Sequence, residues 1–285
     1  MNPFLDFVSG YVRLNQQAKA LPLGQFPPTT RPKLAADAPK ALFFAPHPDD
    51  ECISGGLAVR LLREAGMNVI NVAVTLGSKK ERQAGRLEEL RQACKYLGFG
   101  LALTAPNGLE RVSAKTRAQD PAHWQAGVEV VAKLLATHRP RVVLVPHEGD
   151  WNSTHIGTHF LVRDALDRMP ADFECHVVET EFWGQMSDPN LMVEIGAADV
   201  ADMIAAITFH VGEVARNPYH LSLPAWMLDN VRRGTEIVGG QGGQAPDFSF
   251  AALYRLRRWA QGRLTKTFEG GKLISRSADL RALFP

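Results

Sequence analysis

Short apolar stretches alternate with longer stretches of helical spacing through the first two thirds of the chain. Apolar and β-branched runs of the length typical of strands occupy 41–46, 68–77, 99–106, 141–146 and 174–183. Between them, apolar residues recur with helical spacing over about 54–65, 81–97, 121–138 and 155–168. Gly66 and Gly98 directly follow two of these stretches, which is where helices commonly end.

This alternation predicts the α/β fold class. A strand, a helix and a second parallel strand in succession form a right-handed crossover, so we expect a Rossmann-like, mostly parallel sheet with helices on both faces. In such sheets ligands bind beyond the carboxyl ends of the strands. The residues that follow 41–46 and 141–146 are therefore expected to lie at the same edge of the sheet.

The two ends of the chain follow other patterns. Residues 1–24 have the spacing of a short amphipathic helix, and 26–40 form a proline-rich connector. We therefore expect an N-terminal helix and connector over 1–40 and a single catalytic domain over 41–220. An irregular C-terminal extension of helices and loops is expected over 221–285, packed on the same domain.

The last hundred residues contain four stretches with their own predictions. "AADVADMIAAITFHVGEVA" and "FAALYRLRRWAQGRL" indicate helices, "NPYHLSLPAW" indicates a turn and loop, and "GGQGGQAPDF" indicates a flexible loop. The basic residues of "RLRRWAQGRLTKT" are then expected on a solvent-exposed helix face rather than in a nucleic-acid-binding patch.

Charge and cysteine content argue against several classes of protein. Lysine and arginine total 32 against 30 aspartate and glutamate residues, and this net charge of +2 does not favour a nucleic-acid partner. Cys52, Cys94 and Cys175 lie far apart, so we expect neither a disulfide framework nor a thiolate zinc site. No apolar stretch reaches the roughly 18 residues of a membrane span. A cytoplasmic protein is expected, and a homo-oligomer is left open.

Candidate chemistry begins with "HPDDE", residues 47–51, directly after the first predicted strand. Asp49 or Asp50 could cap a helix, and Glu51 would favour its first turn. That interpretation does not account for a histidine and two adjacent carboxylates at the end of a strand. Adjacent carboxylates repel each other, and a nearby cation is the usual compensation.

A second polar segment, "HEGDWNSTHIGTH" (147–159), follows the fourth predicted strand. His155 and His159 are spaced i, i+4 and share a helix face. One of them, together with His47 and one aspartate, would give two imidazoles and a carboxylate. Three such ligands suit a catalytic zinc ion, because they leave positions open for water and substrate.

The two segments resemble motifs of a known family. "APHPDDE" (45–51) resembles the A-H-P-D-D-E signature of the LmbE/PIG-L family, zinc-dependent N-deacetylases that act on N-acetylglucosamine-type groups. "DWNSTH" (150–155) resembles the family's D-x-H-P-D-H element, and the likeness extends over roughly residues 41–220. The resemblance implies one zinc ion, with Fe2+ as an alternative in the cell. It implies His47, Asp50 and His155 as metal ligands and Asp49 as general base.

Further site residues follow from the same resemblance. Asn152 stands where the family has a histidine that assists the oxyanion or leaving group, so Asn152 is a catalytic candidate that can donate a hydrogen bond but not an acidic proton. His210 is the second catalytic candidate: the proton for the departing amine would come from His210 or from protonated Asp49, and a structural core histidine is the alternative for His210. Arg86, in a segment that resembles the family's second helix, is a candidate for substrate binding, although an exposed ion pair with Glu89 is the alternative. Independently of the resemblance, Tyr219 is a second candidate because it lies in the loop that adjoins the helix of His210.

The implied activity is hydrolysis of an N-acetyl group on an amino sugar or glycoconjugate, with that small molecule as the partner. Asp150 is expected to orient a ligand histidine. Trp151, Trp183 and Trp226 either shape a sugar pocket or pack in the fold. Two other functions stay open: a sugar-binding relative without turnover, motivated by Asn152, and a non-haem iron oxygenase with a His-x-Asp…His triad, whose ligands usually lie on an all-β barrel.

Overall fold

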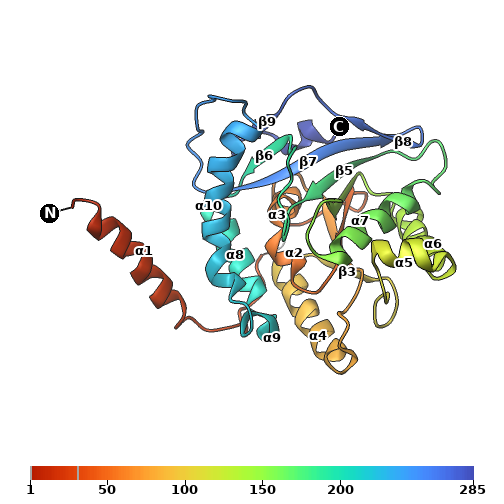
Figure 1. The fold of residues 1–285 in the computed structure, drawn as a ribbon, viewed down its shortest axis with the longest axis horizontal. Coiled ribbons are helices and arrows are strands. Elements are labelled where there is room, and N and C mark those ends of the chain that lie inside the picture. Colours follow the sequence, from red (N-terminus) through yellow and green to blue (C-terminus); the bar gives the residue numbers. More distant parts are fainter. Residues whose placement is uncertain (1, 31) are drawn as a thin grey trace.

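A nine-stranded mixed sheet forms the centre of the computed structural model, which describes residues 2–30 and 32–285. Its order is β3-β2-β1-β4-β5-β7-β6-β9, with β8 paired to β7 (Figure 1). The strands are β1 (Lys40–Ala45), β2 (Asn68–Ala73), β3 (Gly100–Leu103), β4 (Val142–Pro146), β5 (Cys175–Thr180), β6 (Leu191–Glu194), β7 (Ala251–Ala260), β8 (Arg263–Lys266) and β9 (Lys272–Ile274). The helices are α1 (Leu5–Ala18), α2 (Asp50–Ile53), α3 (Gly56–Arg63), α4 (Lys80–Leu97), α5 (Ala114–Gln119), α6 (Pro121–His138), α7 (Ser153–Leu166), α8 (Ala197–Ile207), α9 (Val211–Val214), α10 (Tyr219–Ile237) and the 3-10 helix η1 (Leu280–Leu283).

The first five strands form a parallel half-sheet, as the sequence predicts. β1 pairs with β2 and β4, β2 pairs with β3, and β4 pairs with β5, all in parallel. The chain order 3-2-1-4-5 changes direction between β1 and β4. That change is the topological switch point, where doubly wound sheets bind ligands. The expected fold class, Rossmann-like with helices on both faces, is confirmed.

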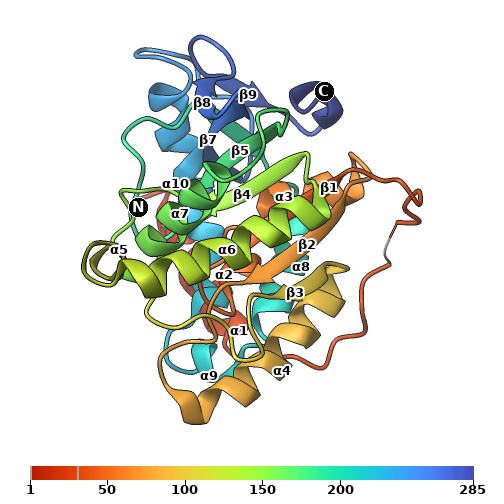
Figure 2. The same ribbon diagram turned by 90° about the vertical axis from the view of Figure 1, so that its right-hand side faces the viewer.

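Alternate side chains of each strand pack against helices on opposite faces. Phe43 of β1 lies in the core that also contains residues of α3, α4, α8 and α10, whereas Phe44 lies in the core formed with α6 and α7. Figure 2 shows α6 and α7 on one side of the strands and α8 on the other. Burial on both faces explains why the parallel strands are continuous apolar runs rather than alternating ones.

Capping residues fix the helices whose limits the sequence predicts well. The left-handed Gly98, with φ 80°, ends α4 after Leu97. Asp120 accepts the backbone N–H of His123 and caps α6, which begins at Pro121. These are the residue types that favour the end and the start of a helix.

The C-terminal third corrects two predictions. Residues 251–260, expected within a helix, form β7, which pairs antiparallel with β5 and β6. The segment "NPYHLSLPAW", expected as a turn and loop, contains the start of α10. In β7, Tyr254 and Leu256 point into the core, and the intervening Arg255 pairs with buried Glu179 of β5 at 2.6 Å. The basic residues therefore lie on a strand, where their charges are partly paired.

Helix α1 lies apart from the sheet and its covering helices (Figure 1). The predicted helix is present, but its large apolar side chains, including Phe4, Phe7 and Tyr11 in and beside the helix, are exposed rather than packed on the sheet domain. None of the described helices has the length and apolar character that crossing a membrane requires. The boundaries at residues 40 and 220 stay predictions, although the sheet is continuous across the second because β7 lies between β5 and β6.

Candidate metal centre and active site

His47, Asp50 and His155 come together at the switch point of the sheet. Each offers a ligand atom within 4.8 Å of the others. Nε2 of His155 lies 3.5 Å from Oδ2 of Asp50, and Nδ1 of His47 lies 3.7 Å from the same oxygen. The backbone N–H of His47 donates to this oxygen at 2.8 Å. The loop after β1 and the first turn of α7 thus supply two imidazoles and one carboxylate.

The donor atoms of this cluster fit a bound cation. Oδ1 of Asp50 and Nε2 of His155 are buried and have no hydrogen-bond partner, whereas buried polar atoms are normally paired. Burial raises the pKa of Asp50, but His155 and His47 outweigh it, so that the pKa lies below its usual value. An ionised carboxylate between two imidazoles matches the ligand set of a catalytic zinc site.

Asp150 lies behind His155 on the side away from Asp50. Its Oδ2 is 3.6 Å from Nδ1 of His155, and the same carboxylate accepts the backbone N–H groups of Asn152 at 2.8 Å and Trp183 at 3.1 Å. A carboxylate in this position fixes the tautomer and the direction of a ligand histidine.

His159, one turn further along α7, lies outside this cluster. Its Nδ1 is 3.0 Å from the carbonyl oxygen of Pro146 and 3.5 Å from Oε1 of Glu179. Of the two histidines that the spacing left as alternatives, only His155 is therefore grouped with His47 and Asp50.

Asp49, the candidate general base, has a strained backbone. Its φ of 121° and ψ of −26° lie in a region that side chains other than glycine rarely adopt. The Asp49 N–H donates to Oε2 of Glu51 at 3.0 Å. Burial and the charge of Asp50 raise the pKa of the Asp49 carboxyl well above its usual value, and Arg86 opposes this shift.

His210 does not reach the substrate side of this loop. Its Nε2 lies 2.8 Å from Oε1 of Glu51, and both side chains are fully buried. The position of His210 favours support of the Glu51 carboxylate over the predicted delivery of a proton to the leaving amine. Glu51, which the sequence suggested only as a favourable first-turn acid, is instead the residue that connects His210 to Asp49.

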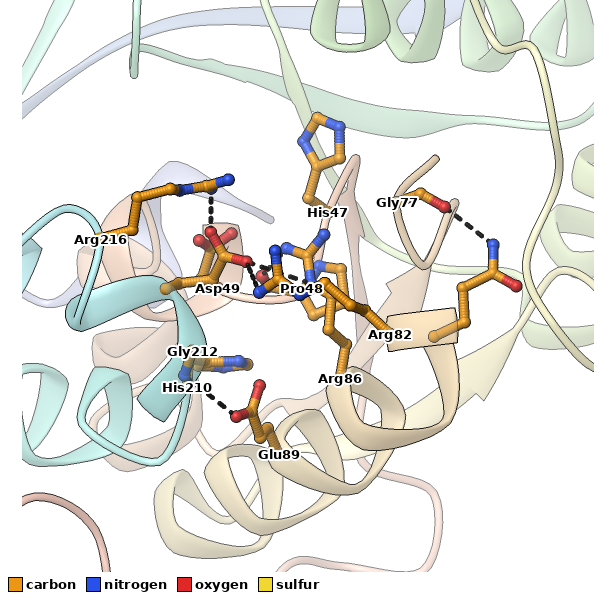
Figure 3. Close-up of polar contacts among 12 residues, drawn as sticks. His47, Pro48, Asp49, Gly77, Arg82, Arg86, Glu89, His210, Gly212 and Arg216 are labelled. Atoms are coloured by element: carbon orange, nitrogen blue, oxygen red, sulfur yellow. Dashed lines mark hydrogen bonds and ion pairs between the residues drawn. The ribbon is translucent and has the colours of Figure 1, made fainter. Parts of the chain in front are cut away.

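Arg86 holds the loop that carries Asp49. Its guanidinium donates to the carbonyl oxygen of Pro48 at 2.9 Å, and its Nε lies 3.7 Å from Oε1 of Glu213. Figure 3 shows Arg86 extending from α4 toward Pro48 and Asp49. A Cβ at Gly77 would lie 2.3 Å from Nη1 of this guanidinium and would displace it, and the φ of 86° at this position also favours glycine. The alternative of an exposed pair with Glu89 is wrong, because Arg86 is largely buried.

Asn152 begins α7 as its N-cap. Its Oδ1 accepts the backbone N–H of Thr154 at 2.8 Å. Because α7 carries His155, the cap fixes the start of the helix that presents a candidate ligand. The sequence predicted Asn152 only as a catalytic candidate and not as a helix cap. Its position directly before a stretch of helical spacing could have indicated the capping role.

Tyr219 is the first residue of α10 and lies among aromatic rings. Its centroid is 5.8 Å from Phe182 and 6.1 Å from Trp183. Burial and the nearby Asp49 carboxylate raise the pKa of Tyr219 to about 12. Its hydroxyl is therefore a hydrogen-bond donor at neutral pH on the Asp49 side of the site.

A cavity of about 350 Å3 opens beside His47. This volume is within the range of small-molecule pockets. Hydroxyl and charged side chains from the loops after β2 and β3 and from α7 line much of it, including Thr75, Ser78, Lys80, Arg111, Ser113 and Thr154. Apart from Thr154, which lies in the second motif segment, these residues belong to no recognisable motif, so the sequence did not reveal them.

The fold and the cluster define the class of protein: a Rossmann-like α/β protein with a two-histidine, one-aspartate site at the switch point of its sheet. Residues 42–166 match the family model PIG-L, described as GlcNAc-PI de-N-acetylase. The resemblance to the LmbE/PIG-L family is confirmed over this part of the chain, which contains both sequence motifs.

Curated relatives match part of the chain. The 1D-myo-inositol 2-acetamido-2-deoxy-alpha-D-glucopyranoside deacetylase of Mycobacterium leprae is 27% identical over 157 residues, which cover 46% of this chain and 51% of the relative. The chain spans about half or less of the length of the curated relatives it matches.

Solved structures with low sequence identity share the fold. The N,N'-diacetylchitobiose deacetylase of Pyrococcus horikoshii has a TM-score of 0.55 at 17% identity, covering 90% of this chain and 93% of that one. GalB, the 4-carboxy-2-hydroxymuconate hydratase of Pseudomonas putida KT2440, has a TM-score of 0.58 at 16% identity, covering 76% and 95%. Since a deacetylase and a hydratase share this architecture, the fold alone does not decide the reaction.

Proposed function

We propose that the chain is a metal-dependent N-deacetylase that hydrolyses the N-acetyl group of an amino sugar or of a glycoconjugate containing one. The observation that carries this proposal is the convergence of His47, Asp50 and His155, with unpartnered donor atoms, beside Asp49 and an open cavity. The family match over residues 42–166 and the activity named for the curated relatives support the same chemistry.

Zinc is the ion that we propose for this cluster, with Fe2+ as an alternative. A divalent ion held by His47, Asp50 and His155 would lower the pKa of a bound water and polarise the acetamide carbonyl. Asp150 orients His155 from behind, and His47 is the partly exposed member of the set.

The remaining steps belong to the chain's own residues. Asp49 accepts a proton from the attacking water while the water oxygen bonds to the amide carbon. The C–N bond then breaks, and Asp49 returns this proton to the departing nitrogen, so that acetate and a free amino sugar leave. Arg86 keeps the Asp49 loop in place, and the Tyr219 hydroxyl is the proposed donor to the substrate.

Rival functions fit the structure less well. The ligands of a non-haem iron oxygenase usually lie on an all-β barrel, whereas this sheet is mostly parallel and covered by helices on both faces. The alternative of a sugar-binding protein without turnover rested on an asparagine at position 152. The role of Asn152 as the N-cap of α7 is another reason for an asparagine at this position. The predicted cytoplasmic location stays a prediction.

Acetate release from a panel of N-acetylated amino sugars tests the proposal. Zinc-loaded native protein should release acetate, and Asp49→Asn should retain the metal while losing most turnover. His155→Ala should lose the metal, whereas His159→Ala, a matched histidine one turn away, should keep it. One bound zinc per chain with no acetate from any sugar on the panel would count against the deacetylase and favour the binding protein.

A further inference from the structure

A row of aromatic rings leads from the candidate metal centre to the surface. The ring centroid of Phe182 lies 5.6 Å from that of His155 and 4.8 Å from that of Trp183. Trp183 in turn lies 6.1 Å from Trp151. We call Phe182, Trp183 and Trp151 the aromatic shelf. It starts at a candidate metal ligand and is therefore continuous with the active site.

The outer part of the shelf is uncovered. Trp151 is 78% exposed and Trp183 is 42% exposed, although tryptophan is usually highly buried in a folded chain. The two indole planes are inclined by 55° rather than stacked. Trp183 therefore does not cover Trp151 face to face, and an apolar ring surface is left open at the mouth of the site.

Buried polar contacts hold the shelf in place. Oδ2 of Asp150 accepts the N–H of Trp183 at 3.1 Å, and Nε2 of His147 lies 2.8 Å from the carbonyl oxygen of Gly184. A Cβ on Gly184 would lie only 2.8 Å from the carbonyl oxygen of Gly149, so the two loops approach as closely as a glycine allows. The loops that carry Trp151 and Trp183 are thus fixed to each other, and Asp150 fixes both relative to His155.

We propose that the aromatic shelf is a subsite for a second sugar ring, attached to the amino sugar whose acetamide group is hydrolysed. This inference rests on the proposed function and specifies its substrate class as an oligosaccharide or glycoside rather than a free monosaccharide. The C–H face of a pyranose ring is apolar and flat enough to stack on an indole, which offers a large, rigid apolar area. Ser153, two residues after Trp151, lines the cavity beside His47, so the shelf and the cavity adjoin at the start of α7.

The cavity and the shelf have complementary chemistry. The cavity beside His47 is lined largely by hydroxyl and charged side chains, which suit a hydroxylated ring, whereas the shelf is aromatic. A ligand pocket commonly combines such an apolar surface with a few polar groups that fix orientation. The cavity lies beside His47 and the shelf beside His155, and the centroids of these two rings are 5.4 Å apart, so two linked sugar rings would contact both surfaces.

Calorimetric titration of zinc-loaded Asp49→Asn protein tests the subsite without turnover. The probes are N-acetylglucosamine, N,N'-diacetylchitobiose and hexyl N-acetylglucosaminide. We expect the disaccharide to bind more tightly than the monosaccharide, and Trp151→Ala to weaken the disaccharide by about tenfold, the loss expected for one aromatic contact. Tyr11→Ala, an exposed aromatic on α1 far from the site, should leave all three affinities unchanged.

Two outcomes would overturn the subsite. One is a disaccharide that binds no more tightly than the monosaccharide, or whose affinity is the same in Trp151→Ala. The other is a gain with the hexyl glycoside alone, which would make the shelf a site for an alkyl chain.

Acetate release by the native enzyme separates this inference from the proposed function. Acetate release with no effect of Trp151→Ala on the KM for the disaccharide would contradict the proposed subsite and support the proposed deacetylase activity. Binding of the disaccharide that depends on Trp151, with no acetate released from any probe, would support the proposed subsite and contradict the proposed deacetylase activity. With both intact, Trp151→Ala should raise the KM for the disaccharide more than that for the monosaccharide, while kcat changes little.

Discussion

Nε2 of His210 lies 2.8 Å from Oε1 of Glu51, and the other oxygen of the same carboxylate accepts the N–H of Asp49 at 3.0 Å. A fully buried pair thereby holds the backbone of the proposed general base at a φ of 121°. Backbone strain of this kind costs on the order of 1–3 kcal/mol and persists only where the surroundings enforce it. We therefore assign His210 as a positioning residue for Asp49.

Replacement of His210 should lower kcat while the metal stays bound. His210→Ala removes one hydrogen-bond partner of the buried Glu51 carboxylate, a loss that destabilises a protein by about 1–3 kcal/mol, and loosens the support of the Asp49 backbone. His210→Gln retains an amide donor and should recover much of the activity. Steady-state kinetics, metal content and thermal unfolding of both variants check this.

The glutamine variant separates positioning from proton transfer. An amide cannot donate a proton of useful acidity, so a His210→Gln enzyme as inactive as His210→Ala, yet folded and metal-bound, would return His210 to the proton-donor role. His176→Ala, a buried histidine near the start of β5, is the control for loss of a buried imidazole.

The candidate metal ligands could be anticipated from the sequence because each lies beside a recognisable strand end. His47 and Asp50 follow an apolar run that predicts a strand. Because the carboxyl ends of parallel strands lie at one edge of the sheet, they are expected beside the segment that follows the fourth strand. The helical spacing alone could not choose between His155 and His159, because both lie on α7 and only the direction of the helix decides which faces the loop; the resemblance of "DWNSTH" to the family motif implied His155. The role of Glu51 depends on a partner 159 residues away, which no local pattern indicates.

The fold was predictable where the local pattern had one interpretation. The parallel strands are apolar on both faces, and capped helices separate them. The prediction for β7 was wrong because "FAALYRLRRWAQGRL" fits both the strand period and the helix period. Tyr254 and Leu256 alternate with Arg255 and Arg257 as in a strand, but the basic and apolar residues also fit a helix face. In the structure Arg255 and Arg257 pair with Glu179 of β5. These long-range contacts stabilise the strand and override the local preference.

Truncation of Leu144 should destabilise the protein strongly. Leu144 is fully buried in β4, the strand beside β1 at the switch point, and Leu→Ala in a tightly packed core costs about 2–5 kcal/mol. Leu228→Ala on the exposed side of α10 should change the free energy of unfolding by no more than about 0.5 kcal/mol. Urea unfolding of both variants measures the difference, and equal losses would contradict the assignment of the core.

Asn152 should tolerate replacement by another capping residue. Asn152→Ala removes the acceptor for the Thr154 N–H and should cost about 1 kcal/mol. Asn152→Ser should keep both the stability and the rate of acetate release, because serine caps helices about as well as asparagine. A serine variant with native stability but a large loss of kcat would show that the Asn152 amide contacts the reacting groups.

Removal of the Asp150 charge should weaken metal binding without abolishing it. Asp150 lies 3.6 Å from Nδ1 of His155 and also accepts backbone N–H groups from both loops of the aromatic shelf. Loss of such a partner typically costs 10–100-fold in metal affinity. For Asp150→Asn, competition with a zinc chelator should therefore give an affinity lower by about this factor.

A matched control isolates the orienting role of Asp150 from the general loss of a negative charge. Asp188 is an exposed acid paired with Arg255, so Asp188→Asn removes the same charge without touching His155, and its zinc affinity should equal that of the native protein. If both variants lost affinity equally, the effect would be long-range electrostatics. If Asp150→Asn kept native affinity, the tautomer of His155 would not depend on Asp150, and the shelf would be coupled to the metal centre only through Phe182.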